Sequence, residues 1–88
     1  MPRLSRFFGI DIYMPSREAN HPLPHFHAKY GGDRVSIAIG TLEVLAGKIP
    51  AKELAMVRGW AFEHRAELQH AWNDMRTGRT PAKIQGLE

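Results

Sequence analysis

Hydrophobic and polar residues alternate in four short stretches of the first half of the chain. A period of two is typical of β-strands, because successive side chains of a strand point to opposite faces. Gly31-Gly32-Asp33 and Gly40-Thr41 separate neighbouring stretches by tight turns, which favours antiparallel pairing in a meander. The predicted strands span residues 7–14, 25–30, 34–39 and 42–47.

The periodicity changes after Pro50. Apolar residues then recur every three or four positions from Leu54 to Met75, as in a helix with one buried stripe. Pro50 lies just before this segment and Gly78 just after it, which are typical start and stop residues. We therefore predict a helix over residues 51–77. Its length of about 39 Å is large for so small a sheet, so a break near residues 64–66 is the alternative.

Placing the helix stripe on one face of the sheet predicts an α+β fold with two layers. The 88 residues are too few for two ordinary domains, so residues 1–88 should form one, with 79–88 as an extended or flexible tail. The sheet face under the helix is predicted to hold Phe8, Ile10, Ile12, Phe26, Ala28, Val35, Ile37, Leu42 and Val44. The opposite face would hold Asp11, Tyr13, His25, His27, Lys29 and Ser36. Only the loop at 15–24 and the tail are left to cover that face.

Composition and charge narrow the class of protein. The chain has no cysteine, which excludes disulfides and thiolate metal sites. No apolar run approaches the roughly 18 residues of a membrane span, and Asp11 interrupts the apolar stretch that a secretory signal requires. We therefore expect a cytoplasmic protein without membrane contact. The net charge of +3 is spread along the chain and indicates a mild preference for anionic partners.

Three histidines fall within seven residues, at His21, His25 and His27. His25 and His27 are two positions apart on a predicted strand, so both rings project from one face. This arrangement suits two imidazoles on one divalent metal, with His21 from the loop or Asp11 from the neighbouring strand as a further ligand. The alternative is that one histidine is hydrogen-bonded in a turn and the others are exposed.

The same cluster suits acid–base chemistry, because histidine both accepts and donates a proton near neutral pH. His25, His27 and Lys29, with Arg34 beside them, would supply the groups of a metal-independent ribonuclease. An inert polar face is the alternative. The sequence contains no phosphate-binding glycine loop, nucleophile elbow or helix-turn-helix spacing, and we predict no cofactor.

Three arginines, Arg58, Arg65 and Arg76, fall along one edge of the helix stripe. Together with Tyr13 and Arg34 of the sheet they form the predicted surface for a nucleic acid or a protein partner. The alternative is that the arginines lie over the rim of the sheet with their heads in water.

Other residues of the predicted helix are expected to be structural. Trp72 and His64 lie inside the stripe, His64 as a core histidine with a hydrogen bond to a carbonyl or a carboxylate. Trp60, at the edge of the stripe, is predicted either as an interface anchor or as a partly buried core residue.

Several blocks of the sequence together resemble a known family. These blocks are Ser5-Arg6-Phe7-Phe8-Gly9-Ile10, then His21-Pro22 and Pro24-His25-Phe26-His27-Ala28-Lys29-Tyr30-Gly31, then Gly47-Lys48-Ile49-Pro50, and the helical Trp60, His64, Glu67, Leu68 and Trp72. Over nearly its whole length the chain resembles a small bacterial family catalogued as domain of unknown function 4160. Leu23 stands where that family usually has a further proline, and the region of Gly40-Thr41 is less acidic than usual.

The resemblance implies a partner but no mechanism. The family carries no assigned activity, and its members are often encoded beside another small domain, as in toxin–antitoxin pairs. Some members are labelled transcriptional regulators. The resemblance therefore implies a protein partner and is also compatible with a nucleic-acid partner.

Our leading hypothesis is a partner-binding component of a toxin–antitoxin-like pair, which meets a second copy or a co-encoded protein through the uncovered face with Tyr13, His25 and His27. The alternatives are a histidine-dependent ribonuclease-type toxin, a divalent-metal-binding module, and a DNA-binding regulator. The last ranks lowest because no helix suited to reading DNA is evident.

Overall fold

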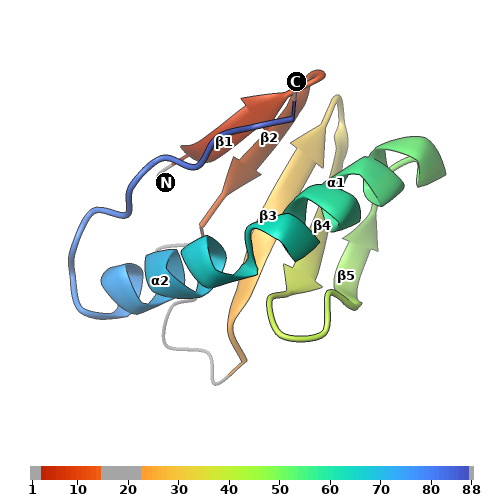
Figure 1. Ribbon diagram of the computed structural model, residues 1–88. Coiled ribbons are helices and arrows are strands. Elements are labelled where there is room, and N and C mark those ends of the chain that lie inside the picture. Colours follow the sequence, from red (N-terminus) through yellow and green to blue (C-terminus); the bar gives the residue numbers. More distant parts are fainter. Residues whose placement is uncertain (1–2, 15–22, 88) are drawn as a thin grey trace.

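The computed structural model describes residues 3–14 and 23–87, which form an antiparallel sheet with two helices on one face (Figure 1). The order of the strands in the sheet follows their order in the chain. The predicted α+β meander is thus confirmed, with five strands in place of four. The strands are β1 (Arg3–Phe7), β2 (Ile10–Tyr13), β3 (His25–Tyr30), β4 (Asp33–Ala38) and β5 (Val44–Lys48), and the helices are α1 (Ala51–Glu63) and α2 (Arg65–Arg76).

The predicted strand at residues 7–14 is wrong, because a hairpin turn divides it. Phe8 and Gly9 have φ angles of 49° and 78°. Two consecutive positive φ angles are typical of a two-residue turn that reverses a strand. Phe8 is therefore 60% exposed at the tip of the β1–β2 hairpin, whereas it was predicted in the core. Its neighbour Phe7 is buried instead.

Phe8 should be a costly residue at this position, because a side chain other than glycine, asparagine or aspartate is strained at positive φ. We expect Phe8→Asn to raise the free energy of unfolding by about 1 kcal/mol, since asparagine tolerates this conformation. Urea unfolding followed by circular dichroism measures the change. Phe8→Ala is the control: it removes the exposed ring and keeps the strain, so an equal gain in both variants would contradict the explanation.

The other strands lie close to their predicted positions. β3 spans His25–Tyr30, as predicted, and β4 begins and ends one residue early. β5 begins two residues later than predicted because Leu42, with φ 62°, belongs to the preceding turn. A bulge then inserts Leu45 between Val44, which pairs with Ile37, and the next paired residue.

The long predicted helix is divided at His64, which confirms the alternative of a break near residues 64–66. His64 has φ −116° and ψ 23°, outside the helical range. Its backbone N–H still bonds to the carbonyls of Trp60 and Ala61, and its carbonyl accepts from Leu68. The two helices therefore change direction with few lost hydrogen bonds. Neither helix in the described part of the chain is long and apolar enough to cross a membrane.

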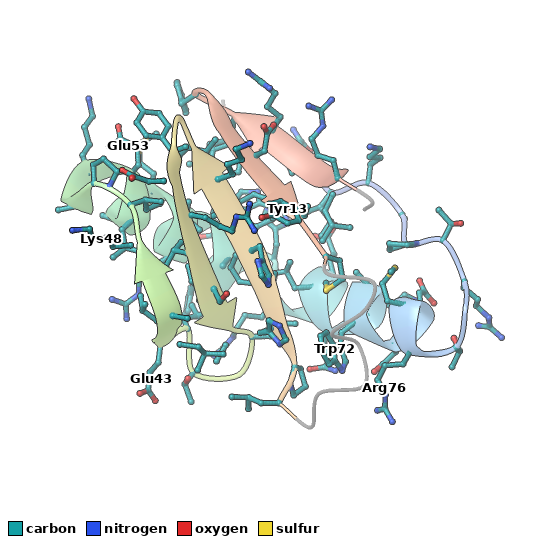
Figure 2. The ribbon with its side chains drawn as sticks, turned by 180° about the vertical axis from the view of Figure 1, so that it is seen from behind. Tyr13, Glu43, Lys48, Glu53, Trp72 and Arg76 are labelled. Atoms are coloured by element: carbon teal, nitrogen blue, oxygen red, sulfur yellow. The ribbon has the colours of Figure 1, made fainter. Side chains whose placement is uncertain are left out.

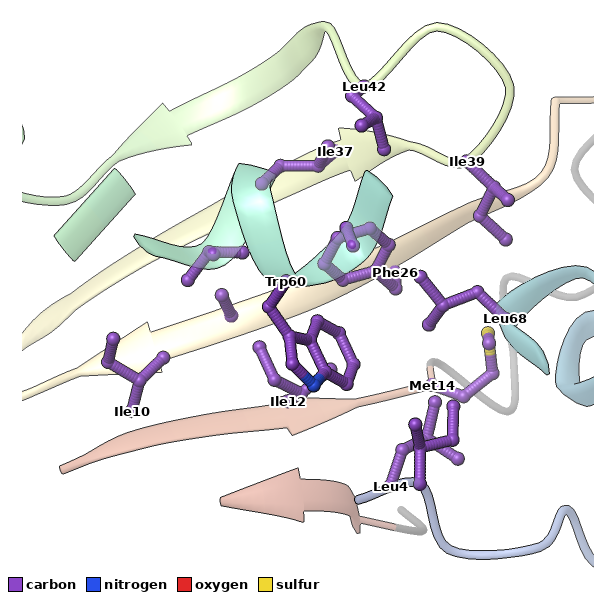
Figure 3. Packing of buried hydrophobic residues seen from close by; sticks show 14 of the residues in the cluster. Leu4, Ile10, Ile12, Met14, Phe26, Ile37, Ile39, Leu42, Trp60 and Leu68 are labelled. Carbon is purple, nitrogen blue, oxygen red and sulfur yellow. The ribbon is translucent and has the colours of Figure 1, made fainter. Parts of the chain in front are cut away.

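The core lies between the sheet and the helices, with Trp60 at its centre (Figure 3). Trp60 is 1% exposed and its ring contacts Phe7 and Phe26, at centroid distances of 5.3 and 6.3 Å. Trp60 is thus a fully buried residue, and Trp72 is also buried, as predicted. Val44, predicted in the core, is 41% exposed because it lies on the edge strand β5.

The segment after α2 returns to the first strand. The backbone N–H of Ile84 donates to the carbonyl of Leu4 at 2.8 Å, and Ile84 itself is buried in the core. The indole Nε1 of Trp60 donates to the carbonyl of Gln85 at 2.8 Å. This segment, residues 79–87, lies on the helix side of β1 and does not cover the opposite face of the sheet (Figure 1).

Candidate functional site

The face of the sheet turned away from the helices carries a row of charged side chains (Figure 2). We call it the outer face. The strand register aligns one residue from each strand, and cross-strand partners point to the same side of the sheet. With strands about 4.8 Å apart, a row across the sheet is roughly 19 Å long. This row, the cationic row, consists of Arg6, Asp11, Lys29, Arg34 and Lys48.

Most of the charge in the cationic row is uncompensated. The only acid in it, Asp11, already accepts hydrogen bonds from Arg6 Nη1 at 3.1 Å and Arg3 Nη1 at 3.3 Å. Lys29, Arg34 and Lys48 form no ion pair with any residue in the described ranges 3–14 and 23–87. Like charges on neighbouring strands are destabilising. The fold therefore maintains a positive potential that attracts anions.

A second row lies beside the first on the outer face. It consists of Arg3, Tyr13, His27, Ser36 and Ala46. Together the two rows hold five cationic side chains and one acid, whereas the whole chain has a net charge of only +3. The positive excess that the sequence spreads along the chain is thus gathered on one face of the folded domain.

Four aromatic rings form a continuous line from the outer face to α2. The ring centroids of Tyr13 and His27 are 5.2 Å apart, those of His27 and His25 are 5.5 Å apart, and those of His25 and Trp72 are 5.1 Å apart. Tyr13 and Trp72 are labelled at the two ends of this line in Figure 2. The rings are tilted against one another, a common arrangement of aromatic pairs. The line ties the outer face to the second helix.

The hydrogen bond of His25 identifies which of its ring nitrogens carries a proton. Nδ1 lies 2.9 Å from the carbonyl oxygen of Leu23. A carbonyl only accepts hydrogen bonds, so Nδ1 is the donor and the neutral ring keeps its lone pair on Nε2. Such an orienting bond to the backbone is frequent in histidines that act as bases or metal ligands.

The predicted catalytic residues His25, His27 and Lys29 do lie on the same face. They differ sharply in access, because His25 is 5% exposed and His27 8%, whereas Lys29 is exposed. The two imidazoles are packed between Tyr13 and Trp72. They therefore support the surface around them and are poorly accessible to a substrate. Lys29 is the member of the three that solvent and ligands reach.

The predicted metal site cannot be assembled from described residues. His21 lies outside them, and among residues 3–14 and 23–87 no three histidines, aspartates or glutamates lie close enough to hold an ion. Asp11, the alternative ligand, is bound to Arg3 and Arg6.

The residues predicted as a nucleic-acid or partner surface belong to two different faces. Tyr13 and Arg34 are on the outer face, whereas Arg58, Arg65 and Arg76 are on the helices. Arg65 Nη1 donates to the carbonyl of Gly40 at 3.0 Å, and its guanidinium lies 5.2 Å from the centre of the Phe62 ring. Arg65 therefore holds α2 to the loop between β4 and β5.

Sequence reasoning missed Arg3, Arg6 and Lys48 of the outer face. Arg3 and Arg6 belong to a strand that was not predicted, and a bulge lies between Arg3 and Ser5, so the alternation is broken there. His64, predicted as a core histidine with a hydrogen bond, is partly exposed and its Nδ1 lies 2.6 Å from Glu67 Oε1. Its ring also packs on Trp60, at a centroid distance of 5.2 Å.

Comparison with known proteins gives a family and no closer relative. A family model described as "Domain of unknown function (DUF4160)" matches residues 9–73, about three quarters of the chain. No curated protein and no solved structure matches the chain. The matched region includes β2 to β5, all of α1 and most of α2.

Proposed function

The chain belongs to the family described as domain of unknown function (DUF4160), and we propose that it is a binding module that holds a single-stranded nucleic acid against its outer face. The observation that carries the proposal is the cationic row, in which Lys29, Arg34 and Lys48 lie side by side without acidic partners among the described residues. A row of cations that lowers stability is best explained by a polyanion that neutralises it.

The shape of the outer face favours a single strand over a duplex. Proteins read the grooves of double-stranded DNA mainly with a helix or a two-stranded ribbon, and both helices of this domain lie on the other side of the sheet. Open sheets with aromatic side chains beside cations are a common platform for unpaired bases. Tyr13, which is partly exposed and one row from Lys29, is the aromatic residue on which we expect a base to stack.

The proposal is compatible with a component of a toxin–antitoxin-like pair. In such a pair the cationic row could be neutralised by RNA, by operator DNA or by an acidic surface of a co-encoded protein. We favour the nucleic acid because Tyr13 supplies a partly exposed ring in the row next to the cations.

Removing two neighbouring cations should weaken binding and leave the fold intact. We expect Lys29→Gln/Arg34→Gln to bind a labelled single-stranded RNA of about 12 nucleotides at least tenfold more weakly. The slope of log K against log salt should fall by about 1.4, because each phosphate contact to a single strand contributes roughly 0.7. Fluorescence anisotropy between about 50 and 200 mM salt measures both quantities. The free energy of unfolding should stay the same or rise by about 0.2–1 kcal/mol, since two like charges are removed.

The matched control is Arg58→Gln/Arg76→Gln, which makes the same change in net charge on the helices. It should leave affinity within about threefold of the wild type, because it removes only distant charges that salt screens. Equal losses in both double variants would mean that net charge alone attracts the nucleic acid, and would contradict the proposal. DNA of the same sequence, an RNA duplex and, where a small protein is encoded beside this chain, that protein are tested in parallel. If only that protein bound tightly, the ligand of the outer face would be a protein and not a nucleic acid.

A second candidate, a ribonuclease, is favoured by the placement of His25, His27 and Lys29 on one face of the sheet. The same labelled RNA tests it: cleavage by the wild type that is lost in His25→Gln, while that variant still binds the RNA, would favour catalysis. RNA that is bound and stays intact removes the ribonuclease candidate.

A further inference from the structure

The two edges of the sheet differ in whether another segment of the described chain covers them. At the β1 edge, Ile84 donates its backbone N–H to Leu4, and Lys83 Nζ donates to the carbonyl of Arg3 at 2.7 Å. Gly86 lies so close that an added Cβ would be 3.0 Å from the carbonyl oxygen of Arg6. This edge is therefore covered by the C-terminal segment.

The β5 edge is open in the part of the chain that the structure describes. All five residues of β5 are exposed, and no backbone hydrogen bond from a described residue reaches the side of β5 that faces away from β4. Val44 and Leu45 are 41% and 43% exposed. Natural proteins usually protect an edge strand with charges, proline or a covering segment, since an open edge pairs readily with other strands. β5 carries a charge at Lys48 and a bulge at Leu45, but no described segment covers it, so its outward backbone groups are open to pairing.

We propose that β5 pairs in antiparallel orientation with β5 of a second copy of this chain, so that the two sheets become one. The charges at the ends of the strand are self-complementary. When the two-fold axis passes between Leu45 and Ala46, Glu43 of one copy lies opposite Lys48 of the other, and the symmetry repeats the contact. Figure 2 shows Glu43 and Lys48 at opposite ends of this strand.

The bulge in β5 makes this pairing geometrically possible. In a regular strand, residues five positions apart point to opposite faces. The extra residue Leu45 shifts this alternation: Lys48 aligns with Arg34 of β4, and the backbone N–H of Ala38 bonds to the carbonyl of Glu43 at 2.9 Å. Both charged residues are thereby brought to the outer face. A two-fold axis perpendicular to the sheet then sets Glu43 and Lys48 of different copies side by side.

A pocket beside the edge gives the partner's lysine a place to lie. Its volume is about 330 Å³ and its walls are mainly apolar. The residues that line it are Leu23, Ala38, Gly40, Thr41, Glu43 and Leu45. In the proposed register Lys48 of the second copy reaches this pocket, where its aliphatic stem covers the apolar wall and its ammonium meets Glu43.

The proposal goes beyond the proposed function and does not depend on it. Because the two-fold axis is perpendicular to the sheet, the outer faces of both copies point the same way. Any ligand of one cationic row would then meet the second row on the same continuous surface.

Charge reversal tests the proposal on the full chain by analytical ultracentrifugation. The wild type is expected to form a concentration-dependent dimer. Glu43→Lys and Lys48→Glu should each weaken dimerisation at least tenfold, because each places like charges opposite each other at two symmetric contacts. The double variant Glu43→Lys/Lys48→Glu restores opposite charges and should restore the dimer to within about threefold.

Glu63→Lys and Lys52→Glu, on α1, are the matched controls and should leave the dimer unchanged. Circular dichroism of every variant verifies that the fold is retained. A wild type that stays monomeric, a dimer that Glu43→Lys leaves unchanged, or a double variant that fails to recover would each overturn the proposal. Binding of a different protein to β5 of a monomeric chain would likewise overturn it, since the occupant would not be a second copy.

Discussion

Replacing Trp60 with alanine should lower the free energy of unfolding by about 3–5 kcal/mol, the usual cost of removing a large buried aromatic side chain. Trp60 is 1% exposed and packs against Phe7 of β1, Phe26 of β3 and His64 at the helix junction. It therefore joins both layers of the core. A domain of this size has a total stability of roughly 4–13 kcal/mol, so the loss is a large part of the whole. Urea unfolding followed by circular dichroism measures it.

Two further variants identify the cause. Trp60→Phe keeps most of the apolar surface but loses the hydrogen bond from Nε1 to the carbonyl of Gln85, so it should cost about 1–2 kcal/mol. Phe62→Ala removes an aromatic ring two residues away that is 63% exposed, and should change stability by about 0.5 kcal/mol or less. If Trp60→Ala cost no more than Phe62→Ala, the central place of Trp60 in the core would be refuted.

The second large effect is expected at Gly47, in β5. Gly47 has φ 75°, and an added Cβ would lie 2.2 Å from the carbonyl oxygen of Arg34 on the neighbouring strand. A left-handed conformation alone costs an ordinary residue about 1–2 kcal/mol. The contact with a backbone atom cannot be relieved by a side-chain rotation, so β4 and β5 must move apart. Gly47→Ala should therefore lower the free energy of unfolding by about 3 kcal/mol, measured by the same urea titration.

Gly32→Ala provides the comparison for Gly47→Ala. No atom lies within 4 Å of the position of its Cβ, and its φ angle is not in the left-handed region. Its stability should stay within about 0.5 kcal/mol of the wild type or rise slightly, because alanine restricts the unfolded chain. A loss at Gly47 no larger than the change at Gly32 would mean that the strands accommodate the methyl group. Hydrogen exchange should also show faster opening of β5 in Gly47→Ala.

Much of the fold follows from periodicity. The strand at His25–Tyr30 could be predicted because its alternation is regular and bounded by proline and glycine, whereas the break near residues 64–66 was an alternative raised by the length of the helix. β1 was missed since a bulge between Arg3 and Ser5 places Leu4 and Phe7 out of the alternation that defines a strand. Phe8 was placed in the core for a related reason. Either of the two adjacent phenylalanines fits the inward positions of a strand, and only the turn at Gly9 decides which of them is buried.

The candidate site was predictable only in part. The outward position of His25, His27 and Lys29 follows from alternation along one strand. The cationic row does not, because it depends on which residue of β1 and of β5 lies beside Lys29 and Arg34. A bulge in each edge strand shifts that register, and no local pattern in the sequence reports it. The burial of His25 depends on Trp72, which is far away in the sequence.

The covering of the β1 edge has a consequence for the chain while it is being made. Leu4 lies in β1, before both helices in the chain, and Ile84, which donates to its carbonyl, is synthesised after both helices. At about 5–20 residues per second, the interval between the end of α2 and residues 84–86 is on the order of one second. Until residues 84–86 dock on β1, a nascent chain whose described strands have already paired carries open edges at both β1 and β5. During this interval, neighbouring nascent chains on one messenger RNA are most exposed to pairing through β1. After β1 is covered, β5 is the open edge among the described strands.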